Sequence, residues 1–179
     1  MRRMIACGPV AAIFMPLLVS AQAAGPATPE AKVQGALSAA PAYIARDAAV
    51  WDWPQSPQDA PVVLRAGSNG WTCFPAQPDT PTNAPVCMDE VILQVRLAEL
   101  RGEEARVDRV GIRYMLQGAG ADDQGRRTLG PHVMISLPAG VSSAEWIGDS
   151  HGPDGPWVTA MDGGTVIIVP VAPAGASVR

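Results

Sequence analysis

The sequence has few of the features that nucleic-acid-binding and metal-binding proteins need. Lys32 is the only lysine among 13 cationic side chains, and no run of basic residues occurs. The formal net charge of −4 becomes −6 if the arginines at positions 2 and 3 are removed with a leader. An acidic chain without a basic patch has no electrostatic means of holding nucleic acid or an anionic membrane surface. We therefore expect neither partner.

Catalytic motifs are also absent. The chain has no phosphate-binding P-loop, no dinucleotide fingerprint and no zinc-protease motif, so it indicates no cofactor. Ser68 lies in Gly67-Ser68-Asn69-Gly70, which lacks the Gly-x-Ser-x-Gly spacing of a nucleophile elbow and is typical of a turn. The motifs therefore do not identify an activity.

Long apolar runs are missing after residue 23, so we expect no membrane span in the mature chain. Residues 1–23 have the three parts of a secretory signal peptide. Arg2 and Arg3 are its basic start, 9–19 its short apolar core, and Ala21-Gln22-Ala23 its small-x-small cleavage site. An uncleaved anchor fits less well, and Cys7 lies on the wrong side of the core for lipidation. We predict an exported protein, periplasmic or secreted, from a bacterium.

Only two cysteines, Cys73 and Cys87, remain after the leader. An oxidising compartment favours joining them in a disulfide bond. A redox-active or metal-binding pair is the alternative, but C-x-x-C spacing is absent and no histidine lies nearby in sequence. We predict a structural disulfide.

Two helices are predicted from their capping residues. Thr28 with Pro29 starts a helix through about Ala39 that has a thin apolar face. Asp89 caps a second helix to about Arg101, and apolar residues on more than one of its faces indicate burial.

Short strands are expected elsewhere, because 18 glycines and 18 prolines imply many turns. The predicted strands cover 50–53, 62–66, 71–74, 110–116, 131–138, 157–161 and 165–171. Asn69-Gly70 predicts a type I′ hairpin between 62–66 and 71–74, and residues 162–164 predict a closing hairpin whose second strand lies inside the sheet.

Together these elements predict an α+β fold. It has a mainly antiparallel sheet of five to seven short strands, one buried helix, a weaker N-terminal helix and one disulfide. The predicted divisions are a signal peptide at 1–23, a linker and helix at 24–46, a single domain at 47–173 and a loose tail at 174–179.

The strand at 131–138 carries the candidate ligand site. Alternation predicts that Val133, Ile135 and Leu137 point inward, leaving His132, Met134 and Ser136 together on the opposite face. A pocket beside His132 would be bordered by the 118–130 and 149–156 loops, which bring Asp149 and His151, and Trp157 would form a wall. In the alternative, His132 only hydrogen-bonds a loop carbonyl. Two imidazoles and a carboxylate are also able to form a metal or hydrolase site, although we assign no metal.

A family resemblance is carried by the segments around the two cysteines, Gly67-Ser68-Asn69-Gly70-Trp71-Thr72-Cys73 and Pro85-Val86-Cys87-Met88-Asp89. Tyr114–Gly118, Gly130–His132 and Gly155–Val158 extend it over roughly residues 48–171. The chain resembles a family of uncharacterised exported bacterial proteins with no assigned function. The resemblance implies a shared fold and export, but no activity. Family members carry a histidine near the start of the last strand, where this chain has Val166.

These observations favour a non-catalytic binding or envelope-associated module that holds an unknown small molecule or protein. The alternative is a hydrolase or metal-dependent enzyme that uses His132, His151 and Asp149.

Overall fold

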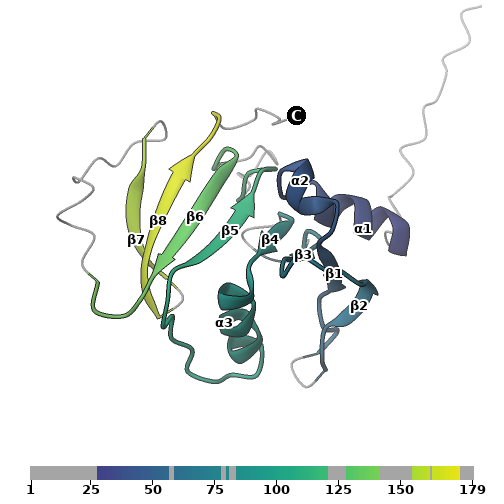
Figure 1. The fold of residues 1–179 in the computed structure, drawn as a ribbon, viewed down its shortest axis with the longest axis horizontal. Helices are drawn as coiled ribbons and strands as arrows, with labels where there is room; N and C mark the ends of the chain where they lie inside the picture. The colour runs from purple at the N-terminus through teal and green to yellow at the C-terminus, as the bar shows by residue number, and fades with distance from the viewer. Residues whose placement is uncertain are drawn as a thin grey trace, which may run out of the picture.

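The computed structural model describes residues 28–56, 59–77, 80, 84–120, 128–141, 155–161 and 163–173. The predicted signal peptide, Asp149, His151 and the tail after 173 lie outside these residues. Within them the chain forms one mixed sheet of eight strands, mostly antiparallel, and few helices (Figure 1). The α+β class and the mainly antiparallel sheet are confirmed, and the strands outnumber the predicted five to seven.

The helices are α1 Pro29–Leu37, α2 Ala42–Ala45 and α3 Glu90–Leu100, and the strands run along the sheet in the order β2-β1-β3-β4-β5-β6-β8-β7. Their bounds are β1 Ala49–Asp52, β2 Val62–Arg65, β3 Thr72–Phe74, β4 Val86–Met88, β5 Gly111–Met115, β6 His132–Leu137, β7 Trp157–Met161 and β8 Gly164–Pro170.

Capping side chains start α1 and α3 where the sequence predicts. Thr28 Oγ1 accepts a hydrogen bond from the Ala31 amide over 3.3 Å, and Pro29 occupies the first turn. Asp89 Oδ1 accepts from the Ile92 amide over 2.9 Å, while its Oδ2 accepts from the Ile112 amide in β5 over 2.7 Å. One carboxylate therefore starts α3 and also fixes the helix to the sheet.

The two faces of the sheet carry different helices (Figure 1). On one face α1 and α2 pack over β1, β3 and β4, burying Ala36, Val50 and the two half-cystines. On the other face α3 packs against β4 and β5, where Ile92, Leu93 and Val95 join a core that includes Phe74, Met88, Met134 and Val166. Successive side chains of a strand point to opposite faces, which is why Cys73 and Phe74 belong to different cores.

The hairpin predicted at Asn69-Gly70 is wrong. Strand β1 lies between β2 and β3, pairing antiparallel with the first and parallel with the second. The link between β2 and β3 crosses the end of β1 instead: the Ser68 amide donates to the Asp47 carbonyl and the Ala49 amide to the Trp71 carbonyl. At Gly67 a Cβ atom would lie 2.0 Å from the Ala49 nitrogen, so the crossing needs glycine there.

The inward face predicted for β6 is also wrong. His132, Met134 and Ser136 are buried, whereas Val133, Ile135 and Leu137 are only half-buried. In the neighbouring strand β5 the buried residues are Gly111, Arg113 and Met115, on the same face. The cause is α3, which covers this face and brings Ile92 against Gly111, where a Cβ would lie 2.5 Å from Ile92 Cδ1.

The closing hairpin is confirmed. Strands β7 and β8 pair antiparallel, with Met161 opposite Gly164, and Gly163 has a φ of 69°. Strand β8 lies between β6 and β7, inside the sheet as predicted, and Pro170 at its end is opposite His132.

Candidate functional site

A cavity of about 340 Å³ lies on the face of the sheet that α3 covers. Its volume is within the range of small-molecule sites, toward the lower end. Most of its lining is apolar, and three of the apolar residues are methionines from three different strands. The apolar lining residues are Trp53, Ala84, Val86, Leu100, Met115, Ala119, Leu129, Met134, Met161 and Ile168. The polar lining residues are Gln77, Thr80, Arg96, Arg113 and His132. An apolar chamber with a few polar side chains is the usual composition of a ligand site.

His132 is the first residue of β6 and is 1% exposed. Its Nδ1 lies 2.7 Å from the carbonyl oxygen of Gly130. Because a carbonyl oxygen only accepts, Nδ1 carries the proton and donates it. In the neutral ring Nε2 is then a bare acceptor, and it has no hydrogen-bond partner in the described part of the chain. A buried acceptor without a partner costs free energy, so it calls for an explanation.

The protonation state of His132 follows from its surroundings. Burial is the main cause that lowers the pKa of the imidazole; the bond to Gly130 opposes this, and the positive charge of Arg113 lowers the pKa further. His132 is therefore neutral at pH 7. A ring with a lowered pKa is a weak proton acceptor in catalysis but remains a good hydrogen-bond acceptor.

Arg113 comes from β5 and is 3% exposed. Its Nε donates to the Met134 sulfur over 3.0 Å and its Nη2 to the Met161 sulfur over 2.8 Å. Thioether sulfur is a weak acceptor, and the two contacts orient the guanidinium beside the cavity.

Arg96 reaches the cavity from α3. Its Nη1 pairs with Glu99 Oε2 over 2.8 Å, one helical turn away. Its Nε is buried and, like Nε2 of His132, has no hydrogen-bond partner among the described residues. Two residues of the cavity lining, Arg96 and His132, therefore each have one buried polar atom without a hydrogen-bond partner among the described residues.

The residues predicted for the site are only partly brought together here. His132 lines the cavity, but Ser136 and Trp157 are not among its lining residues, although both lie on the same face of the sheet. Ser136 is 1% exposed and Trp157 packs half-buried against the core. The catalytic alternative with His151 and Asp149 stays a prediction, since both lie outside the described residues.

Sequence reasoning missed Arg96 and Arg113. A signal for Arg113 was present, because it alternates with Ile112 and Tyr114 in a strand and so shares a face with Met115. No local pattern indicated that Arg96 of a helix and His132 of a strand meet at one cavity. The described residues contain no group of three or more His, Cys, Asp or Glu side chains that would hold a metal ion.

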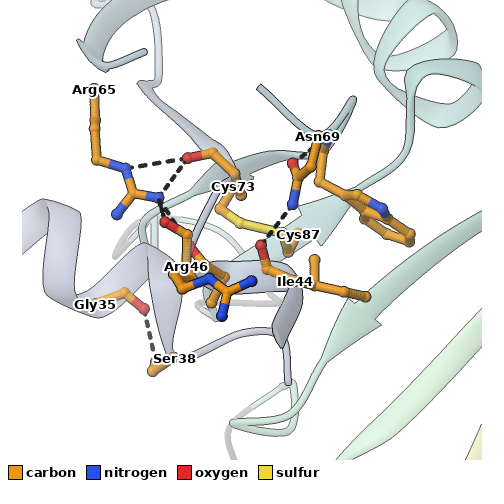
Figure 2. The surroundings of a disulfide bond; sticks show 11 residues. Gly35, Ser38, Ile44, Arg46, Arg65, Asn69, Cys73 and Cys87 are labelled. Atoms are coloured by element: carbon orange, nitrogen blue, oxygen red, sulfur yellow. Dashed lines mark hydrogen bonds between the residues drawn. A yellow bond between two sulfur atoms is a disulfide. The ribbon is translucent and has the colours of Figure 1, made fainter. Parts of the chain in front are cut away.

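The predicted disulfide is confirmed. Cys73 and Cys87 are directly opposite in the antiparallel pair of β3 and β4, and both are fully buried. Figure 2 shows Asn69, whose Nδ2 donates to the Ile44 carbonyl over 2.8 Å, and Arg65, whose guanidinium donates to carbonyl oxygens of residues 45, 46 and 48. These bonds hold the α2 segment over the disulfide. Because both half-cystines are buried, the disulfide has the surroundings of a structural bond rather than of one that takes part in thiol–disulfide exchange.

No helix in the described ranges is long and apolar enough to cross a membrane. Comparison of the chain with protein-family models, curated proteins and solved structures found no match.

Proposed function

We propose that the protein is an exported, non-catalytic binding module that holds a small molecule in the cavity beside His132. The observation that carries the proposal is the mostly apolar cavity of about 340 Å³, which has His132 among its few polar lining residues.

Binding fits the residues around the cavity better than catalysis does. The lowered pKa of His132 makes it a weaker general base than an ordinary histidine. Three methionines give the wall the adaptability that suits ligand binding, since their unbranched side chains repack easily.

Export is part of the proposal. It rests on the leader at 1–23 and on the resemblance to exported bacterial proteins around the cysteines. The disulfide between Cys73 and Cys87 is compatible with an oxidising compartment.

The test uses hexan-1-ol as a probe and isothermal titration calorimetry on the mature protein. Wild type is expected to bind the probe, and Ala84→Leu, which adds bulk to the cavity wall, is expected to weaken binding about tenfold or more. The matched control is Ala31→Leu, on the exposed surface of α1, which is expected to bind like wild type. Absence of binding to wild type, or equal binding by Ala84→Leu, would refute the site.

A further inference from the structure

We infer that two copies of this chain pack face to face through the open face of the sheet. The open face consists of the residues of β5, β6, β8 and β7 whose side chains point away from α3. This interface is separate from the proposed ligand site, because the cavity lies on the face that α3 covers.

A row of four β-branched residues crosses the centre of the open face. Ile135 of β6 is opposite Ile112 of β5 on one side and opposite Ile167 of β8 on the other. Val158 of β7 is opposite Ile167 and completes the row. All four residues are half-buried, so each remains partly accessible. Four neighbouring strands therefore present one continuous apolar strip.

The positions beside this strip are also uncharged. Val133 and Val169 are opposite each other on one side of it. On the other side Thr165 is opposite Leu137 and Ala160, and it is the one polar residue of the open face. A sheet face that meets water normally carries polar residues in alternation with the buried apolar ones. The open face lacks this alternation, which is the pattern of a face that a partner covers.

The described helices leave the open face uncovered. On this side of the sheet α1 and α2 pack over β1, β3 and β4, and Tyr114 lies at the border of their cluster. In Figure 1 the strands β6, β8 and β7 lie at the opposite end of the sheet from α1 and α2. Val110 and Val171, next to the ends of β5 and β8, are 51% and 48% exposed. A contiguous accessible apolar patch marks an interaction site.

The charge pattern favours a second copy of the chain as the partner. The open face carries no charged residue, so two copies meet there without like-charge repulsion at the contact. The chain as a whole is acidic, with a formal net charge of −4, which disfavours an anionic lipid surface. A flat apolar sheet is complementary to itself, because two sheets stack about 10 Å apart and two-fold symmetry supplies the same patch twice.

The size of the open face fits a weak, reversible dimer. Four strands spaced by about 4.8 Å and roughly 17–24 Å long give a flat area of about 400 Å² on each copy. This is smaller than the roughly 800 Å² per partner of a standard stable interface. We therefore expect dissociation in the micromolar range.

Sedimentation equilibrium of the mature protein, from about 1 µM to about 1 mM, tests the inference. Wild type is expected to pass from monomer to dimer. Ile135→Lys places a charge at the centre of the face on both copies and is expected to weaken the dimer about a hundredfold or more. The matched control is Val63→Lys in β2, at the other end of the sheet and 60% exposed, which is expected to dimerise like wild type.

Two further variants keep the test independent of that lysine. Ile135→Thr retains a β-branched side chain but loses apolar area, and should weaken the dimer about tenfold if Ile135→Lys does not fold. Ile135→Cys should crosslink two copies through a short bismaleimide, because central residues of a two-fold interface lie near their own copies. Val63→Cys is the control that should not crosslink.

Several results would overturn the inference. These are a wild-type monomer throughout the series, a dimer that both Ile135→Lys and Ile135→Thr leave unchanged, or equal crosslinking of the two cysteine variants. A monomer that cosediments with phosphatidylcholine vesicles would instead make lipid the occupant of the open face. A monomer whose Ile135→Cys thiol resists alkylation would show that another part of the same chain covers it.

Discussion

Nδ1 of His132 donates to the carbonyl oxygen of Gly130 over 2.7 Å, and this bond decides which nitrogen of the ring remains for the cavity. The two residues are neighbours on the same short stretch that leads into β6, so the orientation of the ring is set locally. The other residues that line the cavity come from distant parts of the sequence, among them α3 and β5. The proposed binding site therefore depends on both the local orientation of the ring and the long-range packing of these elements.

The stability of the protein is expected to fall as the pH falls below about 6.5. The pKa of His132 is lowered from 6.5 in the folded state, so the unfolded state binds a proton at a higher pH than the folded state does. The stability that neutral His132 provides is complete above the unfolded pKa and is lost as the pH drops toward the folded one. Urea unfolding from pH 8 to pH 5 measures this.

The control for this titration is His132→Asn, which does not titrate and leaves Arg113 and Arg96 in place. Its stability is expected to change less between pH 7 and pH 5 than that of wild type. His151 is common to both proteins and cancels in the comparison. If the free energy of unfolding changed equally with pH in the two proteins, His132 would not be the group responsible for the loss of stability.

Two glycines are expected to respond in opposite directions to alanine. Gly67→Ala places a Cβ 2.0 Å from the Ala49 nitrogen and forces the backbone at the β2–β3 crossing to move, which costs about 2 kcal/mol or more. Gly35→Ala, in α1 with nothing within 4 Å, is expected to stabilise by about 0.5–1 kcal/mol. Chemical denaturation distinguishes them, and a stabilising Gly67→Ala would show that β1 does not lie beneath this link.

Asp89→Ala is expected to destabilise more than Thr28→Ala, although both remove a helix cap. The Thr28 cap is exposed, and its loss costs about 1 kcal/mol or less. Asp89 caps α3 and also accepts from the Ile112 amide over 2.7 Å, so its loss costs roughly 2–4 kcal/mol. Equal unfolding free energies for the two variants would mean that the link from α3 to β5 contributes nothing.

Removing the disulfide is expected to lower the free energy of unfolding strongly. With Cys73 and Cys87 both replaced by alanine, the loss is roughly 2–5 kcal/mol, because a loop with a sequence separation of 14 is no longer closed in the unfolded chain. The mature wild-type protein should resist alkylation until it is unfolded and reduced, since both half-cystines are fully buried. Mass spectrometry that finds free thiols in protein from its own compartment would contradict this.

Local signals predicted the elements that local forces determine. Thr28 and Asp89 mark helix starts because a capping oxygen acts on amides two or three residues away, and Gly163 permits the positive φ of the closing turn. The parallel pairing of β1 with β3 has no such signal, so Asn69-Gly70 appeared to be a simple hairpin.

The buried face of β6 was missed for a similar reason. Alternation shows that His132, Met134 and Ser136 share a face, but it does not show which face a distant helix covers. Hydropathy favoured Val133, Ile135 and Leu137 as the core, yet α3 packs on the other side. The cavity combines residues of α3 and of the strands β4, β5, β6, β7 and β8, and only the folded chain brings these together.

The central claim, that a small molecule binds in the cavity beside His132, is tested most directly by ¹⁵N NMR of the labelled imidazole in wild-type protein. Without ligand at pH 8, we expect Nδ1 to be protonated and Nε2 to have the resonance of an unprotonated nitrogen. Addition of hexan-1-ol should shift the Nε2 resonance, because the probe would occupy the cavity that His132 lines. A proton on Nε2 in the free protein, or an Nε2 resonance that saturating hexan-1-ol leaves unchanged, would contradict the account.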